Sequence, residues 1–156
     1  MPEESIFSDK EISFLRELNR EKVEYMIVGL SAAALQGAPV VTQDVDLWFM
    51  DLVDPGIQKA LSRVGGAYVP PRGQNPPMFV GDAVKLFDIV THMPGLEEYE
   101  KEKQHTIKVS IGRLKVRVLA LERIILSKEA TGRERDRLAL PVLRDALIAI
   151  RGSRDH

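Results

Sequence analysis

Residues Tyr25–Leu47 read YMIVGLSAAALQGAPVVTQDVDL, and this stretch decides the fold. Its first four residues are apolar and predict a short strand that ends at Gly29. The small residues that follow favour a helix, which Gly37 would stop. From Val45 to Met50, apolar residues predict a second strand. The predicted order is therefore strand, glycine turn, short helix and strand.

Two carboxylates lie at the start of the second strand. Asp44 and Asp46 are separated by one residue and would project from one face, about 6.5–7 Å apart at the backbone. A third, Asp88, interrupts an apolar run that predicts a strand from Val84 to Val90. Acidic residues are disfavoured in strands, so three of them call for an explanation. A shared cation provides one, because Mg²⁺ binds carboxylate oxygens and keeps positions for water and phosphate.

Gly29 adds a second feature. A strand that passes through a glycine into a helix leaves backbone N–H groups and the positive helix end at one point, which suits a triphosphate. A glycine followed by alanines also serves close packing of a helix on a sheet, however. The carboxylates have a second explanation as well, in which each lies on a solvated face. Periodicity does not show that two strands are neighbours, so both alternatives stay open.

The rest of the chain predicts further helices and strands. Residues 8–11 form a capping box for a helix over about 9–21, and Asp54-Pro55 starts another that ends at 65–66. The proline-rich residues 69–77 predict a loop. Strands are predicted at 106–111 and 114–119, and helices at 120–132 and from near Pro141 to about 150.

These elements predict the α+β class. We expect a mixed β-sheet with helices packed on it and a C-terminal helical pair. The length of 156 residues suits a single domain over 1–156, with a core over about 23–118 and the helical pair over about 120–150. No linker divides it.

The composition disfavours several classes of function and of site. With 22 basic and 23 acidic residues and no visible basic stripe, a nucleic-acid-binding domain is disfavoured, although net charge does not exclude a local basic patch. The absence of cysteine excludes disulfides and thiolate zinc sites. An acidic, polar N-terminus and the lack of long apolar runs predict a cytoplasmic protein with no membrane partner.

The stretch quoted above resembles the signature of the polymerase-β-type nucleotidyltransferase superfamily. In particular, it is similar to a small bacterial branch, the minimal nucleotidyltransferases related to AbiEii-type toxins. The similarity extends over about residues 23–148, because 119–128 and 132–138 resemble the helix, lysine and Arg-x-x-Asp segment of that branch. The signature positions are Gly29, Ala32, Gly37, Pro39, Thr42, Asp44 and Asp46, with Asp88 at the third carboxylate.

The resemblance implies a Mg²⁺-dependent nucleotidyltransferase that moves an NMP group from an NTP to an RNA or protein hydroxyl. Two Mg²⁺ ions are implied, with Mn²⁺ as a substitute. The implied catalytic and metal-binding residues are Asp44, Asp46 and Asp88. The implied nucleotide-binding residues are Gly29, Ser31, Lys128 and Arg133. For the last two, a solvated helix face or a structural Arg133–Asp136 pair is an equal alternative.

The expected partners are an NTP and an acceptor, either RNA such as tRNA or a protein. Some relatives are toxins paired with an antitoxin, so a cognate antitoxin is a further candidate. Two positions depart from the family pattern. Leu30 stands where a Gly or Ser follows the first glycine, and Val40 stands where many relatives carry Arg. These departures support an alternative, a catalytically degenerate binding or interaction module on the same fold.

Overall fold

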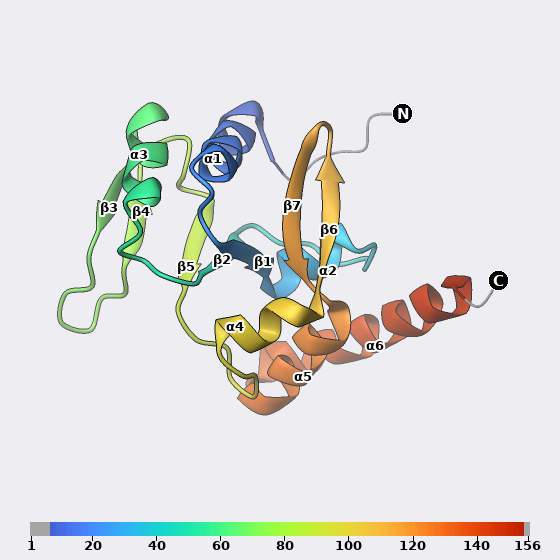
Figure 1. The fold of residues 1–156 in the computed structure, drawn as a ribbon. Helices are drawn as coiled ribbons and strands as arrows, with labels where there is room; N and C mark the ends of the chain where they lie inside the picture. The colour runs from blue at the N-terminus through green and yellow to red at the C-terminus, as the bar shows by residue number, and fades with distance from the viewer. Residues whose placement is uncertain (1–6, 155–156) are drawn as a thin grey trace.

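The structure is a computed structural model that describes residues 7–154, and the side chains of residues 7–152. A five-stranded mixed sheet lies at its centre, in the order β5-β2-β1-β7-β6 (Figure 1). Strand β2 is antiparallel to β1 and parallel to β5, whereas β7 is parallel to β1 and antiparallel to β6. The strands are β1 (Tyr25–Val28), β2 (Val45–Phe49), β5 (Phe87–Val90), β6 (Thr106–Ile111) and β7 (Leu114–Leu119).

Helices and a small second sheet surround this centre (Figure 1). Strands β3 (Ala67–Val69) and β4 (Met78–Val80) form the second sheet. Near the C-terminus, α5 and α6 pack against each other. The helices are α1 (Asp9–Arg20), α2 (Gly29–Leu35), α3 (Pro55–Arg63), α4 (Tyr99–Glu102), the 3₁₀ helix η1 (Lys103–His105), α5 (Leu121–Thr131) and α6 (Glu134–Arg154).

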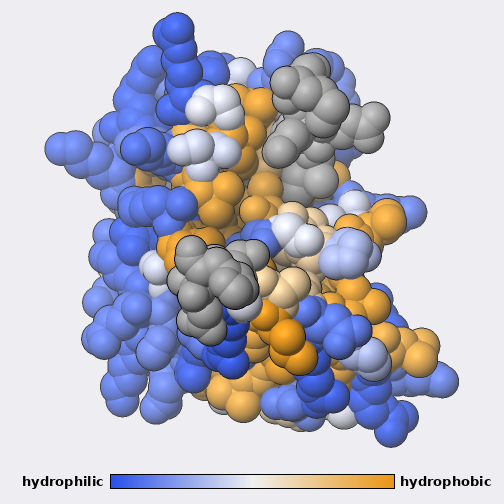
Figure 2. All heavy atoms as spheres, turned by 90° about the vertical axis from the view of Figure 1, so that its right-hand side faces the viewer, coloured by the Kyte–Doolittle hydropathy of each residue, from blue (hydrophilic) through white to orange (hydrophobic). Residues whose placement is uncertain are grey.

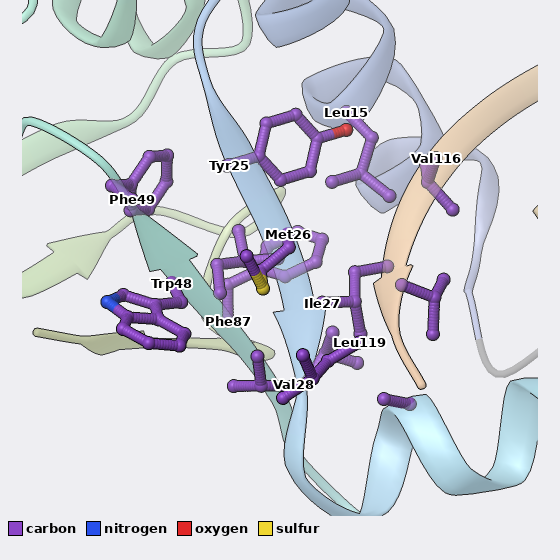
Figure 3. Packing of buried hydrophobic residues seen from close by; sticks show 14 of the residues in the cluster. Leu15, Tyr25, Met26, Ile27, Val28, Trp48, Phe49, Phe87, Val116 and Leu119 are labelled. Atoms are coloured by element: carbon purple, nitrogen blue, oxygen red, sulfur yellow. The ribbon is translucent and has the colours of Figure 1, made fainter. Parts of the chain in front are cut away.

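The two faces of the central sheet are covered differently. On one face, the ring of Phe14 in α1 contacts Phe87 in β5, with centroids 5.5 Å apart. On the opposite face, the ring of Tyr99 in α4 meets Trp48 in β2 edge-on, with centroids 5.6 Å apart. Strand β1 is buried along its whole length between β2 and β7, as Figure 3 shows for Met26. The central strands are therefore fixed by packing on both sides.

A further face of the molecule remains partly apolar. Figure 2 shows hydrophobic side chains gathered through the middle of the side on which β6 and the end of α6 lie. Exposed apolar side chains of α6 include Leu138 and Ile148. Among the helices of residues 7–154, none combines the length and the apolar character that a membrane span requires.

The predicted α+β class, with its mixed sheet and C-terminal helical pair, is confirmed. Local signals were accurate: the Ser8 N–H donates to Glu11 Oε1 at 2.8 Å, as a capping box requires, and the Asp54 side chain caps α3. The strands predicted at 106–111 and 114–119 are present as β6 and β7, and their hairpin turns at Gly112. Helix α5 ends at Gly132, which has the left-handed conformation.

Three predictions about element bounds were wrong. Residues 84–86 form a turn instead of the start of β5, because the Val84 N–H donates to the Gly81 carbonyl and Phe87 N–H to that of Val84. The final helix begins at Glu134, so Pro141 lies inside it. Acidic residues in the first turn favour that earlier start. Asp44 lies one residue before β2 instead of on it.

Two small features were not predicted. The proline-rich loop joins β3 to β4, so the sequence on either side of it is extended. Helix α4 and η1 are too short to produce a helical period in the sequence.

Candidate active site

Asp46 and Asp88 are aligned partners on the neighbouring parallel strands β2 and β5. Aligned residues of adjacent strands carry their side chains on the same face of a sheet. Both carboxylates therefore project from the face that also carries Trp48. The sequence alone did not establish that the strands carrying Asp46 and Asp88 are neighbours.

Asp44 lies in the bend that leads into β2, and its side chain is exposed. The Thr42 hydroxyl donates a hydrogen bond of 2.6 Å to the carbonyl oxygen of Asp44, which fixes the bend. The Val45 N–H donates to the Leu86 carbonyl and begins the pairing with the segment before β5. The bend thus brings a third carboxylate to the edge of the Asp46–Asp88 pair.

Gly29 forms the turn between β1 and α2 and has a φ of +71°, a left-handed conformation that favours glycine. A Cβ atom at this position would overlap the carboxylate of Asp46. The Val28 residue just before the turn is the antiparallel partner of Asp46. The glycine turn and the carboxylates therefore meet, and only a residue without a side chain fits between them.

Ser31 ties this turn to β2. Its hydroxyl donates to the Val28 carbonyl at 2.9 Å and accepts from the Asp46 N–H at 3.4 Å. The side chain is buried, at 1% exposure. In this structure, the Ser31 hydroxyl holds the backbone of Asp46 in place. The departures Leu30 and Val40 are half-buried and pack against the hydrophobic core.

The carboxylates are electrostatically crowded. Burial raises the pKa of Asp46 to about 6, and the charges of Asp88 and Asp44 add to the shift. Lys128 and Arg135 lower the pKa of Asp46 in partial opposition. Burial and the charge of Asp44 also raise the pKa of Asp88. Negative charge in this site is therefore incompletely balanced, which is the electrostatic condition for binding a cation.

The carboxylates of Asp44, Asp46 and Asp88 do not form a cluster of three metal ligands. Within the described part of the chain, no group of three or more His, Cys, Asp or Glu side chains is arranged to hold a metal ion. Mg²⁺ is commonly bound through one or two carboxylates, with water and substrate phosphates completing its shell. The aligned pair of Asp46 and Asp88 fits that requirement.

Lys128 and Arg133 meet at a buried carboxylate, Asp136. Lys128 Nζ lies 3.0 Å from Asp136 Oδ1, and Arg133 Nε lies 2.8 Å from Oδ2. The Thr131 hydroxyl donates to Asp136 Oδ2 at 2.6 Å. Burial alone would raise the pKa of Asp136, but hydrogen bonds from Thr131, Lys128 and Arg133 lower it to about 2. The structural Arg133–Asp136 pair considered from the sequence is thus present.

The structure also assigns places to residues outside the predicted set. Arg135 acts electrostatically on Asp46, although no local pattern separates it from the neighbouring arginines. Trp48 is buried against Tyr99, so it serves as a core residue next to the carboxylates.

No family model and no curated protein sequence matches this chain. Solved structures do match it. The solution structure of the antibiotic-resistance factor ANT(2'')-Ia has a TM-score of 0.54 and 14% identity, over 94% of this chain and 96% of that one. A provisionally assigned nucleotidyltransferase from Thermotoga maritima has a TM-score of 0.54 and 20% identity, over 92% of this chain and 89% of that one.

The chain has the nucleotidyltransferase fold. The crystal structure of ANT(2'')-Ia in complex with adenylyl-2''-tobramycin agrees, with a TM-score of 0.51 and 14% identity over 86% of this chain and 94% of that one. The nucleotidyltransferase fold thus extends over nearly the whole chain, in agreement with the resemblance noted in the sequence.

Proposed function

We propose that this chain is a metal-dependent nucleotidyltransferase that moves an NMP group from an NTP to a hydroxyl of an RNA or protein acceptor. The observation that carries the proposal is the register pairing of Asp46 with Asp88, directly against Gly29. The fold supports it, because solved structures with this fold include ANT(2'')-Ia in complex with adenylyl-2''-tobramycin.

Asp44, Asp46 and Asp88 would hold Mg²⁺, or Mn²⁺ in its place. The bound ions would orient the phosphates and neutralise the charge of the leaving pyrophosphate. The acceptor oxygen forms a bond to the α-phosphorus as the bond to pyrophosphate breaks. Asp88 would take the proton of the acceptor hydroxyl, a role that suits a carboxylate with a raised pKa.

The phosphate end of the site would be built from the glycine turn and the C-terminal helices. Gly29 lets the backbone approach the triphosphate, because no side chain stands between the turn and Asp46. Ser31 would act through its hold on the Asp46 backbone as well as through its own N–H. Lys128 and Arg133 are both paired with Asp136, so they would have to release that carboxylate before they could bind phosphate. Triphosphate binding therefore implies a rearrangement of that ion-pair cluster.

The finer biological assignment follows the sequence resemblance. On that resemblance we propose that the protein belongs to the small bacterial branch related to AbiEii-type toxins. The proposed location, from the composition, is the cytoplasm. A tRNA end is one acceptor of this kind, and a cognate antitoxin would be a partner if the protein is a toxin.

The second candidate is a catalytically degenerate binding module. It is favoured by Leu30, whose bulk lies next to the glycine turn, and by the pairing of Lys128 with Asp136. Such a module would leave the phosphate-binding groups engaged within the protein. It predicts no metal-dependent NTP binding.

Isothermal titration of NTPs separates the two candidates. The wild-type protein is titrated with each NTP, with Mg²⁺ and with EDTA, and the titrations are repeated on Asp46→Ala. We expect heat that depends on Mg²⁺ in the wild type and is absent in the variant. No binding by the wild type at millimolar NTP would refute the enzyme and leave the module.

A further inference from the structure

A second concave site lies on the same face of the sheet as the carboxylates. Ile27 of β1 is aligned with Leu47 of β2 and with Val118 of β7, so these three share one face. Because side chains alternate along a strand, Asp46 and Arg117 both project from the other face. The two sites lie at different ends of this face, since Asp46 pairs with the end of β1 and the second site with its start.

The second site is a groove of about 250 Å³ in which four cationic side chains meet. Arg117 and Lys115 come from β7, Lys108 from β6, and Lys22 from the turn between α1 and β1. We call it the basic groove. Its remaining lining residues are Asn19, Val23, Glu24 and Tyr25.

Charge in the basic groove is only partly balanced from within the protein. The single carboxylate in its lining, that of Glu24, is paired with Lys103 Nζ at 2.9 Å, and the charges of Lys103 and Arg117 together lower its pKa. Within residues 7–152, no carboxylate forms an ion pair with Lys22, Lys108 or Lys115. A chain with a net charge of −1 has enough acidic residues to balance such a groove. The groove nevertheless stays positive.

One feature of the basic groove costs stability. Lys108 and Arg117 are directly opposite each other on β6 and β7, and like charges in that relation are destabilising. The repulsion is explained if the groove binds an anion. The positive φ of Lys22, +58°, has a local cause, because Lys22 follows the C-cap of α1 and the Val23 N–H donates to the Leu18 carbonyl.

The lining of the groove indicates the class of anion. Val23 and Tyr25 are buried, so the groove offers neither an apolar side chain to enter a lipid layer nor a ring to stack on a base. Lys115 and Arg117 are two residues apart on β7, so their side chains project from the same face, about 6.5–7 Å apart, and form a row of cations. A row of cations without base contacts fits the repeating phosphates of a nucleic-acid backbone.

The cavity of about 520 Å³ beside Trp48, at the Met50 end of β2, is lined by Glu97, Glu98 and Glu100 against Lys101, and would repel phosphate. We propose that the basic groove binds the phosphodiester backbone of an RNA acceptor. As an acceptor site it rests on the proposed function, whereas binding itself does not require nucleotide or metal.

The test uses a fluorescein-labelled single-stranded oligouridine and the full-length protein, in EDTA and without NTP. Binding is followed by fluorescence anisotropy between low and moderate salt. Four phosphate contacts predict a slope of log K against log salt of about −2.8, and Lys108→Gln/Lys115→Gln should reduce it to about −1.4. The matched control is Lys10→Gln/Lys59→Gln, which removes the same charge from exposed lysines of α1 and α3.

The control variant should bind RNA with the wild-type slope, and the groove variant should unfold at the wild-type temperature or above it. Equal slopes for the groove variant and the wild type would overturn the proposal. So would the absence of RNA binding, or binding of phosphatidylserine vesicles in its place. Asp46→Ala should keep RNA binding. Failure of NTP binding with RNA binding intact would count against the enzyme alone, and the reverse result against the groove alone.

Discussion

Gly29 lies directly against the carboxylate of Asp46, so that a Cβ atom on Gly29 would overlap that carboxylate. The contact joins the two halves of the candidate site, the turn that would receive phosphate and the strand whose carboxylates would bind metal. The positive φ of Gly29 also favours glycine, because residues with a side chain rarely adopt this conformation. Conformation and space therefore both require glycine at this position.

Gly29→Ala should displace Asp46 and abolish metal-dependent NTP binding. It should also lower the free energy of unfolding by about 1–3 kcal/mol, through left-handed strain and the clash together. The control is Gly112→Ala, because Gly112 has a similar φ of +62° but open space around it. Urea unfolding and NTP titration measure both effects. A Gly29→Ala protein that binds NTP as the Gly112→Ala protein does would show that the contact is unimportant.

Asp46→Asn should stabilise the protein at neutral pH in the absence of metal. The pKa of Asp46 is raised to about 6 in the folded state, from its ordinary value of 3.8. The folded state thus holds a proton that the unfolded state releases, and stability falls as pH rises from about 4 to 6. Above pH 6 the variant should be more stable by roughly 1–2 kcal/mol, after allowance for solvent screening.

Urea unfolding in EDTA at pH 4 and at pH 7.5 measures this difference. The advantage of Asp46→Asn should be present at pH 7.5 and should nearly vanish at pH 4. An equal difference at both pH values would mean that the Asp46 charge is balanced in the folded protein.

Asp136→Asn should destabilise the packing of α5 against α6. The Asp136 carboxylate is buried and accepts hydrogen bonds from Thr131, Lys128 and Arg133. Its pKa is lowered to about 2, so its contribution is full above pH 4 and is lost as pH falls toward 2. We expect a loss of about 2–4 kcal/mol at pH 7.

Arg133→Ala provides the comparison, because the Arg133 side chain is 59% exposed. Its removal should cost no more than about 1 kcal/mol. Chemical unfolding of both variants at pH 7 decides the point. A larger effect for Arg133→Ala than for Asp136→Asn would contradict this account of the cluster.

Lys108→Glu should raise the stability of the hairpin while it weakens RNA binding. Glu at this position would face Arg117 directly, and an opposite-charge pair across two strands stabilises by about 0.2–1 kcal/mol. Lys59→Glu on α3 makes the same change of charge away from the basic groove. Thermal unfolding should show a gain for the first variant and not for the second. A lower melting temperature for Lys108→Glu would contradict the assigned repulsion.

Local features of the site were predictable from the sequence. The glycine turn, β1 and the strand around Asp46 follow from hydrophobic runs and from residues with special backbone preferences. Capping signals at Ser8 and Asp54 likewise act within a few residues. In each case, the residues that produce the signal lie close together in the chain.

Non-local features were not predictable. The alignment of Asp46 with Asp88 depends on how β5 pairs with β2, and a short apolar run carries no register information. The basic groove escaped notice because its cations come from three separated segments. A residue-by-residue search for a basic stripe finds none, since Lys22, Lys108 and Arg117 come together only when the sheet forms.

Nucleotidyl transfer at these carboxylates is tested by following a labelled nucleotide. The protein is incubated with Mg²⁺, total RNA or total protein, and NTPs labelled at either the α- or the γ-phosphate. We expect label on an acceptor from the α-phosphate and none from the γ-phosphate. We also expect loss of the signal in both Asp46→Asn and Asp88→Asn. Label from the γ-phosphate, or transfer that survives either substitution, would contradict nucleotidyl transfer at these carboxylates.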